Sequence, residues 1–313
     1  MSARPGNPGV VAPVPGANAP TNGTAATTLP PSRRGFGWRL LSSLVLWGIM
    51  LAVIFWLKRP IWLYLFLNLV IARAVWEFYV ICEAKGLRTY KVWGVIGTLA
   101  LISGSWFFYQ RPERLQLSYD FDVLILLVFA LGVFLRQFPQ KLNPQGIETM
   151  SVTLFGLIYV AWLGNFMTRI NFASPHGRYF VMLLVVATKF TDIGAYLVGS
   201  TLGRHKMIPR ISPKKTWEGT VGGIAFAVGG VFLCRWVMPD EMAALTNLHA
   251  VVIGLLLGVA AVIGDLAESL IKREAGVKDS STILPGHGGC LDMIDSLLFT
   301  APLLYVYMRL VLR

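Results

Sequence analysis

The 313-residue chain is 55% hydrophobic and only 14% charged. This excludes an ordinary soluble domain, in which roughly 25% of residues are charged. The net charge of +12 comes from Lys and Arg in short clusters between apolar runs. Such clusters are typical of topology determinants and anionic-lipid contacts, so nucleic acid is not expected as a partner. The cysteines Cys82, Cys234 and Cys290 lack the spacing of a zinc site or a disulfide framework.

Residues 1–35 are rich in Pro, Gly, Ala and Thr and poor in large apolar residues. Such a segment cannot bury enough surface to order itself, so it is predicted to be a disordered tail. Hydrophobicity begins only at Leu40, too far along the chain for the apolar core of a signal peptide. We therefore expect the first span to be retained, and residues 36–313 to form one transmembrane domain.

Nine apolar segments near membrane-spanning length follow the tail. They are 40–57, 61–82, 92–109, 121–135, 149–168, 179–199, 220–238, 249–271 and 296–312. The sequence thus predicts an all-α, polytopic integral membrane protein with about nine transmembrane helices. Several segments are short and interrupted by glycine, which favours helices packed against one another.

The distribution of Lys and Arg predicts the orientation in the membrane. With the N-terminus in the cytoplasm, most loop Lys and Arg residues lie on the cytoplasmic side. The loop 239–248 has no Lys or Arg and contains Asp240 and Glu241, as expected of an outside loop. The two polar loops, 200–219 and 272–295, then both face the cytoplasm.

Ionisable residues gather around the second of these loops. Asp265, Ser269 and Lys272 are spaced as one stripe of a helix, with Glu268 on its flank. Asp265 lies almost two turns inside the membrane, counted back from Lys272. An unpaired carboxylate at that depth is costly, so it needs a cation.

The last span opens with Asp292 and Asp295, which share one helix face. If this helix lies beside the helix of Asp265, three carboxylates converge without a His or Cys cluster. Oxygen ligands of this kind favour a hard ion such as Mg²⁺ over zinc. The alternative is simple neutralisation of the acids by basic residues nearby, namely Lys272, Arg273 and Lys278.

A glycine-rich turn precedes these aspartates. Gly286, Gly288 and Gly289 let the backbone approach a ligand, and a helix N-terminus that attracts phosphate follows them. A glycine turn between two helices is also common without any ligand. His287 in the same turn is either an acid or base or a simple hydrogen-bonding group.

The first polar loop forms a second group of candidates. Lys189 and Asp192 are three residues apart and are expected to pair, either as part of a site or as a structural ion pair. Ser212 and Pro213 predict a helix start, with Ser212 as the cap. The basic residues of the loop either neutralise a polyphosphate or only set the orientation. They are Arg204, Lys206, Arg210, Lys214 and Lys215.

Two further patterns bear on function. Glu77 lies inside the second span one turn after Arg73, and an intrahelical ion pair accounts for it. No GxxxxGK[ST] sequence occurs, which excludes a P-loop nucleotide site.

Taken together, the motifs of residues 40–313 resemble those of the phosphatidate cytidylyltransferases (CDP-diacylglycerol synthases). The resemblance rests on four groups in the last loop and on Asp192 with the run SPKKTWEG at 212–219. The four groups are Ser269-x-x-Lys272-Arg273, Lys278-Asp279, Pro285-x-His287-Gly288-Gly289 and Asp292-x-x-Asp295. Two positions depart from the family pattern. Met293 stands where the family usually has Arg, and Cys290 stands where it has an aliphatic residue.

The resemblance implies an integral membrane enzyme that joins CTP to phosphatidic acid, giving CDP-diacylglycerol and pyrophosphate. It also implies Mg²⁺, with K⁺ as a second metal, and it places Asp265 and Asp292 on the metal-ligating aspartates with Asp295 beside them. We therefore expect a catalytic group of Asp265, Lys272, Arg273, His287, Asp292 and Asp295. The expected substrate-binding group is Asp192, Ser212, Lys214, Lys215, Ser269, Lys278, Asp279, Gly288 and Gly289.

Under this hypothesis a phosphatidate oxygen attacks the α-phosphorus of CTP, and no side-chain nucleophile is needed. The preference for CTP rests wholly on the resemblance. A related enzyme that uses CTP on a polyprenol or another lipid is the nearest alternative. An ion-coupled transporter is a second, because intramembrane Asp and Lys also line ion pathways. A homodimer is one assembly that the sequence leaves open.

Overall fold

The computed structural model describes residues 48, 52, 59–111, 115–141, 143–281 and 288–312, with the backbone alone at 115–119. The expected tail, 1–35, lies outside the described residues. So do His287 and, apart from two residues, the first expected span, 40–57.

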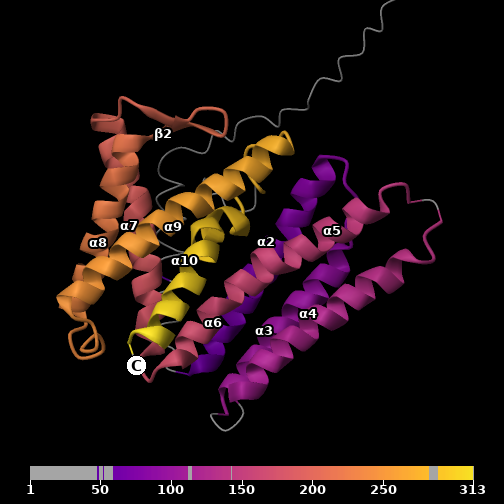
Figure 1. The fold of residues 1–313 in the computed structure, drawn as a ribbon, viewed down its shortest axis with the longest axis horizontal. Helices are drawn as coiled ribbons and strands as arrows, with labels where there is room; N and C mark the ends of the chain where they lie inside the picture. Colours follow the sequence, from indigo (N-terminus) through magenta and orange to yellow (C-terminus); the bar gives the residue numbers. More distant parts are fainter. Residues whose placement is uncertain are drawn as a thin grey trace, which may run out of the picture. The chain divides into compact units, whose positions relative to one another are not determined.

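The described part of the chain forms helices and one short β-hairpin (Figure 1). The helices are α2 (Pro60–Ala84), α3 (Lys91–Tyr109), α4 (Leu115–Gln137), α5 (Gly146–Gly156), α6 (Leu163–Ala173), α7 (Gly177–Thr201), α8 (Trp217–Val237), α9 (Asn247–Glu274) and α10 (Cys290–Leu310). A π-helical turn, η3 (Leu157–Trp162), joins α5 to α6. The prediction of a helical, multi-pass membrane protein is confirmed.

The expected count of nine spans is not confirmed. Within the described residues, seven helices are long and apolar enough to cross a membrane. They are Pro60–Ala84, Lys91–Tyr109, Gly146–Ala173, Gly177–Thr201, Trp217–Val237, Asn247–Glu274 and Cys290–Leu310. The helix α4, which covers the expected span 121–135, is not among them.

The helices α7 to α10 pack in sequence order, and α10 also contacts α2 and α6 (Figure 1). The helices α2, α3 and α4 form a second series of neighbours. Because lipid is as apolar as the helices, close van der Waals packing must hold them together. Small residues let α7 and α8 approach closely, among them Gly194 and Gly223. The helix α10 thus joins the two series.

The hairpin lies between α7 and α8. Its strands, β1 (Lys206–Ile208) and β2 (Ser212–Thr216), are antiparallel, with Lys206 opposite Thr216. The predicted helix start at Ser212 is therefore wrong. The extended backbone of β2 accommodates Pro213, as edge strands do. The helix α8 begins only at Trp217, where the Thr216 hydroxyl oxygen accepts a hydrogen bond of 3.2 Å from the Gly219 N–H.

Candidate active site

A cavity of about 370 Å³ lies where α7, β2, α8, α9 and α10 meet. Acids and lysines from four of these elements line it. The charged lining residues are Lys189 and Asp192 of α7, Lys214 and Lys215 of β2, Asp265 of α9, and Asp292 and Asp295 of α10. The structure thus brings together six of the site residues predicted from sequence, from segments more than 100 residues apart.

The close crossing of α9 and α10 brings their acids together. A Cβ atom added at Gly264 would lie 2.8 Å from the Asp295 carbonyl oxygen and 2.9 Å from Ser296 Cα. Both neighbours are backbone atoms, so a larger residue would push the two helices apart. Glycine at position 264 therefore allows Asp265 to stand next to Asp295.

Three carboxylates converge at this crossing. One oxygen from each of Asp265, Glu268 and Asp295 lies within 4.8 Å of the others. Glu268 and Asp295 are buried, and Glu268 Oε1 has no hydrogen-bond partner among the described residues. Buried carboxylates so close together repel one another, and a hard divalent cation would relieve that repulsion. The donor set fits such an ion.

Asp292 lines the same cavity but is held differently. Its Oδ1 accepts a 2.6 Å bond from Lys272 Nζ, which also donates to Glu268 Oε2 at 2.8 Å. Its Oδ2 accepts bonds from the Ser280 hydroxyl at 2.6 Å, the Ser280 N–H at 3.0 Å and the Gly289 N–H at 2.7 Å. Asp292 is thus largely satisfied by the protein, whereas the acids at the crossing are not.

Lysines stand opposite the acids. Lys215 forms an ion pair with Asp265 and also contacts the Val262 carbonyl oxygen at 3.4 Å. Lys189 lies 3.2 Å from Asp192, which confirms the predicted pair. A cavity that offers oxygen ligands on one wall and ammonium groups on another suits a metal-bound phosphate compound.

The other predicted site residues lie outside the cavity lining. Arg273 donates from Nε to the Ile211 carbonyl oxygen at 3.3 Å and so ties α9 to the hairpin. Lys278 and Asp279 are exposed. The remaining ones are Ser212 at the start of β2, Ser269 and Lys272 on α9, and Gly288 and Gly289 before α10. The roles of all these residues remain predictions.

Sequence reasoning placed Glu268 only on the flank of the stripe, yet its carboxylate belongs to the cluster. Its position three residues after Asp265 was the available signal, because residues three apart share a helix face. Thr191 and Tyr196 of α7 also line the cavity, and no local motif marked them.

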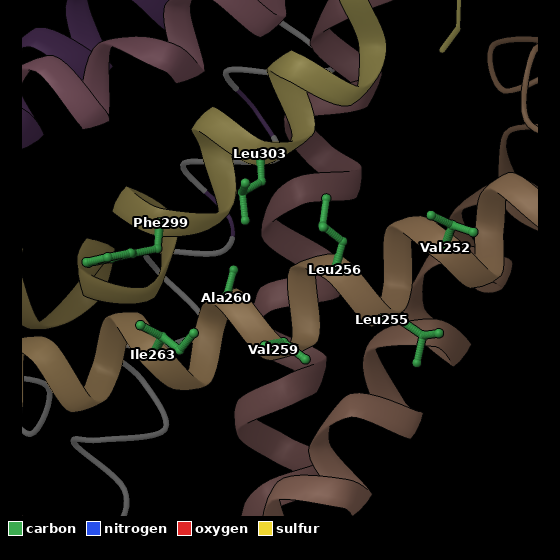
Figure 2. Close-up of a pocket in the computed structure, with 8 residues that line it drawn as sticks. All are labelled: Val252, Leu255, Leu256, Val259, Ala260, Ile263, Phe299 and Leu303. Atoms are coloured by element: carbon green, nitrogen blue, oxygen red, sulfur yellow. The ribbon is translucent and has the colours of Figure 1, made fainter. Parts of the chain in front are cut away.

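A second hollow, of about 470 Å³, lies on another side of α9. Figure 2 shows that only apolar side chains of α9 and α10 line it, among them Ile263 and Phe299. Ile263 and Asp265 are two residues apart, or about 200° around the helix. The groove therefore lies away from the acids and offers no group for chemistry.

The chain matches the sequence model of the cytidylyltransferase family over residues 38–311. It is 32% identical to the uncharacterized protein YnbB of Escherichia coli, over 89% of this chain and 90% of that protein. It is 30% identical to a phosphatidate cytidylyltransferase of Bacillus subtilis, over 85% of this chain and 97% of that protein. A phosphatidate cytidylyltransferase of Synechocystis is 33% identical, over 78% of this chain and 87% of that protein.

Proposed function

Since the chain belongs to the cytidylyltransferase family and is therefore a nucleotidyltransferase, we propose that it transfers CMP from CTP to phosphatidic acid. The products are CDP-diacylglycerol and pyrophosphate. The relatives named phosphatidate cytidylyltransferase support this choice of substrates. The observation that carries the proposal is the cavity that combines a carboxylate cluster with three lysines.

Asp265, Glu268 and Asp295 would hold the divalent cation, Mg²⁺ in this proposal, with K⁺ as the second metal. When bound, the ion offsets negative charge on the phosphate oxygens of the two substrates. Asp292 lines the same cavity and completes the acidic wall. Lys272 keeps Asp292 and Glu268 in a fixed relation by donating to both.

The lysines of the cavity would bind the substrate phosphates. Lys189, Lys214 and Lys215 lie where they can receive the triphosphate. A phosphatidate oxygen attacks the α-phosphorus of CTP and forms the new P–O bond, while the bond to the pyrophosphate oxygen breaks. Both reacting groups are anions, so the catalytic task of this chain is to bind and orient them. No side chain acts as nucleophile in this proposal.

We further propose that the site faces the cytoplasm. Exposed basic residues near the cavity support this orientation, because Lys and Arg concentrate on that side. Among them are Arg204, Lys206 and Arg210 of the hairpin region. The acyl chains of the lipid then remain in the bilayer while its phosphate reaches the cavity. The division of the chain into an N-terminal tail (1–35) and a catalytic domain (36–313), and its assembly as a homodimer, are further parts of the proposal.

The two alternatives are less well supported. The charged lining of the cavity comes from the middle and C-terminal half of α7, the C-terminal half of α9, the N-terminal end of α10 and β2, and the N-terminal end of α8 adds Gly219 and Thr220. If successive helices are antiparallel, these segments all lie toward the same side of the membrane. A transport route needs polar groups across the midplane. An enzyme that uses CTP on a polyprenol shares this geometry, so only the lipid acceptor separates it from our proposal.

The test is an assay of the purified full chain with labelled CTP. Phosphatidic acid and a polyprenol are offered as separate acceptors, each with Mg²⁺ and with a chelator. We expect Mg²⁺-dependent CDP-diacylglycerol and pyrophosphate with phosphatidic acid alone. Product with the polyprenol but not with phosphatidic acid would transfer the assignment to the first alternative. No product with either lipid would overturn the proposed function.

A further inference from the structure

The helix α10 begins without a capping side chain of its own. Its N-cap residue is Gly289, which has no side-chain oxygen to accept a bond from the first N–H groups of the helix. An α10 start that is buried and uncapped would be costly. The first turn also carries Asp292, and Asp295 follows one turn into the helix.

A residue of α2 takes the place of the missing cap. Glu77 Oε2 accepts a hydrogen bond of 2.9 Å from the Leu291 N–H, across 214 residues of sequence. Glu77 is only 1% exposed, and its Oε1 lies 3.2 Å from Arg73 Nε. The predicted Arg73–Glu77 ion pair is confirmed, and it leaves the other carboxylate oxygen facing α10. A negative charge at this point also complements the positive end of the helix dipole.

Ser280 connects this cap to the site. Its hydroxyl oxygen lies 2.6 Å from Asp292 Oδ2 and 3.3 Å from Glu77 Oε2. A hydroxyl has one proton, so it donates to the nearer acid, Asp292. A Cβ atom at position 289 would collide with both the Glu77 carboxylate and the Ser280 hydroxyl. Glycine at this position is what lets the two acids and the serine meet.

We propose that Glu77 is a positioning residue of the active site, acting as an N-cap supplied to α10 by another helix. By fixing where α10 begins, it sets the positions of Asp292 and Asp295 relative to Asp265 and Glu268. The part of this inference that concerns metal binding rests on the proposed function. The capping role stands on the contacts of Glu77 itself.

The test compares Glu77→Ala and Glu77→Gln with Asp122→Asn in the full chain. Asp122 is a control, because it is a buried acid that does not line the cavity. Hydrogen exchange of peptides that cover residues 288–296 reports on the start of α10. Electron paramagnetic resonance of added Mn²⁺ reports on the acid cluster. Thermal unfolding and the Mg²⁺ dependence of the transfer reaction complete the measurements.

For Glu77→Ala we expect faster exchange at the start of α10 and about tenfold weaker Mn²⁺ binding, as for other residues that orient ligands. Glu77→Gln keeps an oxygen acceptor, so its exchange and Mn²⁺ binding should fall between those of Glu77→Ala and the unaltered chain. Asp122→Asn should lower thermal stability and leave both other readouts unchanged. If Glu77→Ala does not fold, the same comparison is made with Glu77→Gln.

The proposal is overturned if the Glu77 variants exchange at α10 like the unaltered chain. It is also overturned if Asp122→Asn weakens Mn²⁺ binding as much as they do, because the effect is then general loss of stability. If the unaltered chain makes no CDP-diacylglycerol, the proposed function fails by itself. Exchange at α10 still decides whether Glu77 is the cap.

Discussion

Two groups of buried charged residues in this protein differ in whether their charges are balanced. The first is the acid cluster of Asp265, Glu268 and Asp295, which borders a cavity. The second is the ion pair of Asp122 on α4 and Arg169 on α6, which we call the sealed pair. Both place ionisable side chains inside a helical bundle, where isolated charges are costly.

The two charges of the sealed pair are buried and have partners within the bundle. The side chains of Arg169 and Asp122 are only 6% and 4% exposed. The Ser105 hydroxyl donates to Asp122 Oδ1 at 2.8 Å, and Asn165 donates to that hydroxyl oxygen at 2.7 Å. The guanidinium of Arg169 also lies over the ring of Phe166, 4.6 Å from its centre. One acid is paired with one base, and neither side chain lines the cavity.

The acid cluster is not balanced in this way. Lys215 pairs with Asp265, and Lys272 pairs with Glu268 while it also serves Asp292. Asp295 has no lysine or arginine within ion-pair distance among the described residues. Its neighbours at the crossing are acids, and it faces the cavity. The comparison teaches that an excess of carboxylate beside open volume, rather than burial alone, marks the site.

The largest expected effect comes from Asp295→Asn. It removes the least compensated acid of the cluster, so we expect transfer activity to fall about 10³-fold, or ~4 kcal/mol of transition-state stabilisation. Thermal stability should stay the same or rise, because repulsion from Asp265 and Glu268 is relieved. The assay with labelled CTP and thermal unfolding in detergent measure the two quantities. Full activity in this variant would remove Asp295 from the site.

Breaking the sealed pair should affect stability instead. Arg169→Met leaves Asp122 buried without its cation, which costs about 3–5 kcal/mol of folding free energy. The activity per folded molecule should stay within about twofold of the unaltered chain, since the pair is remote from the reacting groups. Adding Asp122→Asn to Arg169→Met should restore most of the lost stability. A loss of activity per folded molecule without loss of stability would show that the sealed pair takes part in catalysis.

A smaller effect on substrate binding is expected for Lys215→Met. Removing one charge-assisted contact to phosphate should raise KM for CTP about tenfold with little change in stability. Lys206→Met is the matched control, because Lys206 lies exposed in β1 of the same hairpin and does not line the cavity. Equal changes in KM for both variants would indicate a general effect of hairpin charge.

The smallest effect should come from Thr216→Ala, which removes the cap of α8 at the edge of the cavity. We expect a loss of about 1 kcal/mol of stability and only a slight change in rate. Thr216→Ser keeps the hydroxyl and should retain stability. A large fall in rate for Thr216→Ala alone would mean that the hydroxyl takes part in binding substrate.

Much of the architecture could be predicted because membrane spans leave a strong local signal. The apolar run 249–271 matched α9 within three residues at each end. The helix start at Ser212 failed because a Ser-Pro pair fits both a helix N-terminus and an edge strand. The pairing of β2 with β1, in which Ser212 lies opposite Ile208, decided between them.

The candidate site was only partly predictable, because local signals mark single residues but not contacts between distant segments. Asp265, Asp292 and Asp295 stood out because acids are rare in apolar helices. Which oxygens converge depends on the helix crossing at Gly264, and hence Glu268 joined the cluster while Lys272 and Ser280 held Asp292. The link from Glu77 to Leu291 joins distant segments, so no spacing rule could have suggested it.

That link also has a consequence for biosynthesis. Ribosomes deliver α2 early and α10 last, and two of the cavity's four aspartates arrive only with that final helix. A nascent chain that has inserted only α2 to α9 therefore lacks two of the four aspartates of the proposed site. If the proposed site is the active one, activity would require α10 to dock against α2, and incompletely synthesised copies would not consume nucleotide.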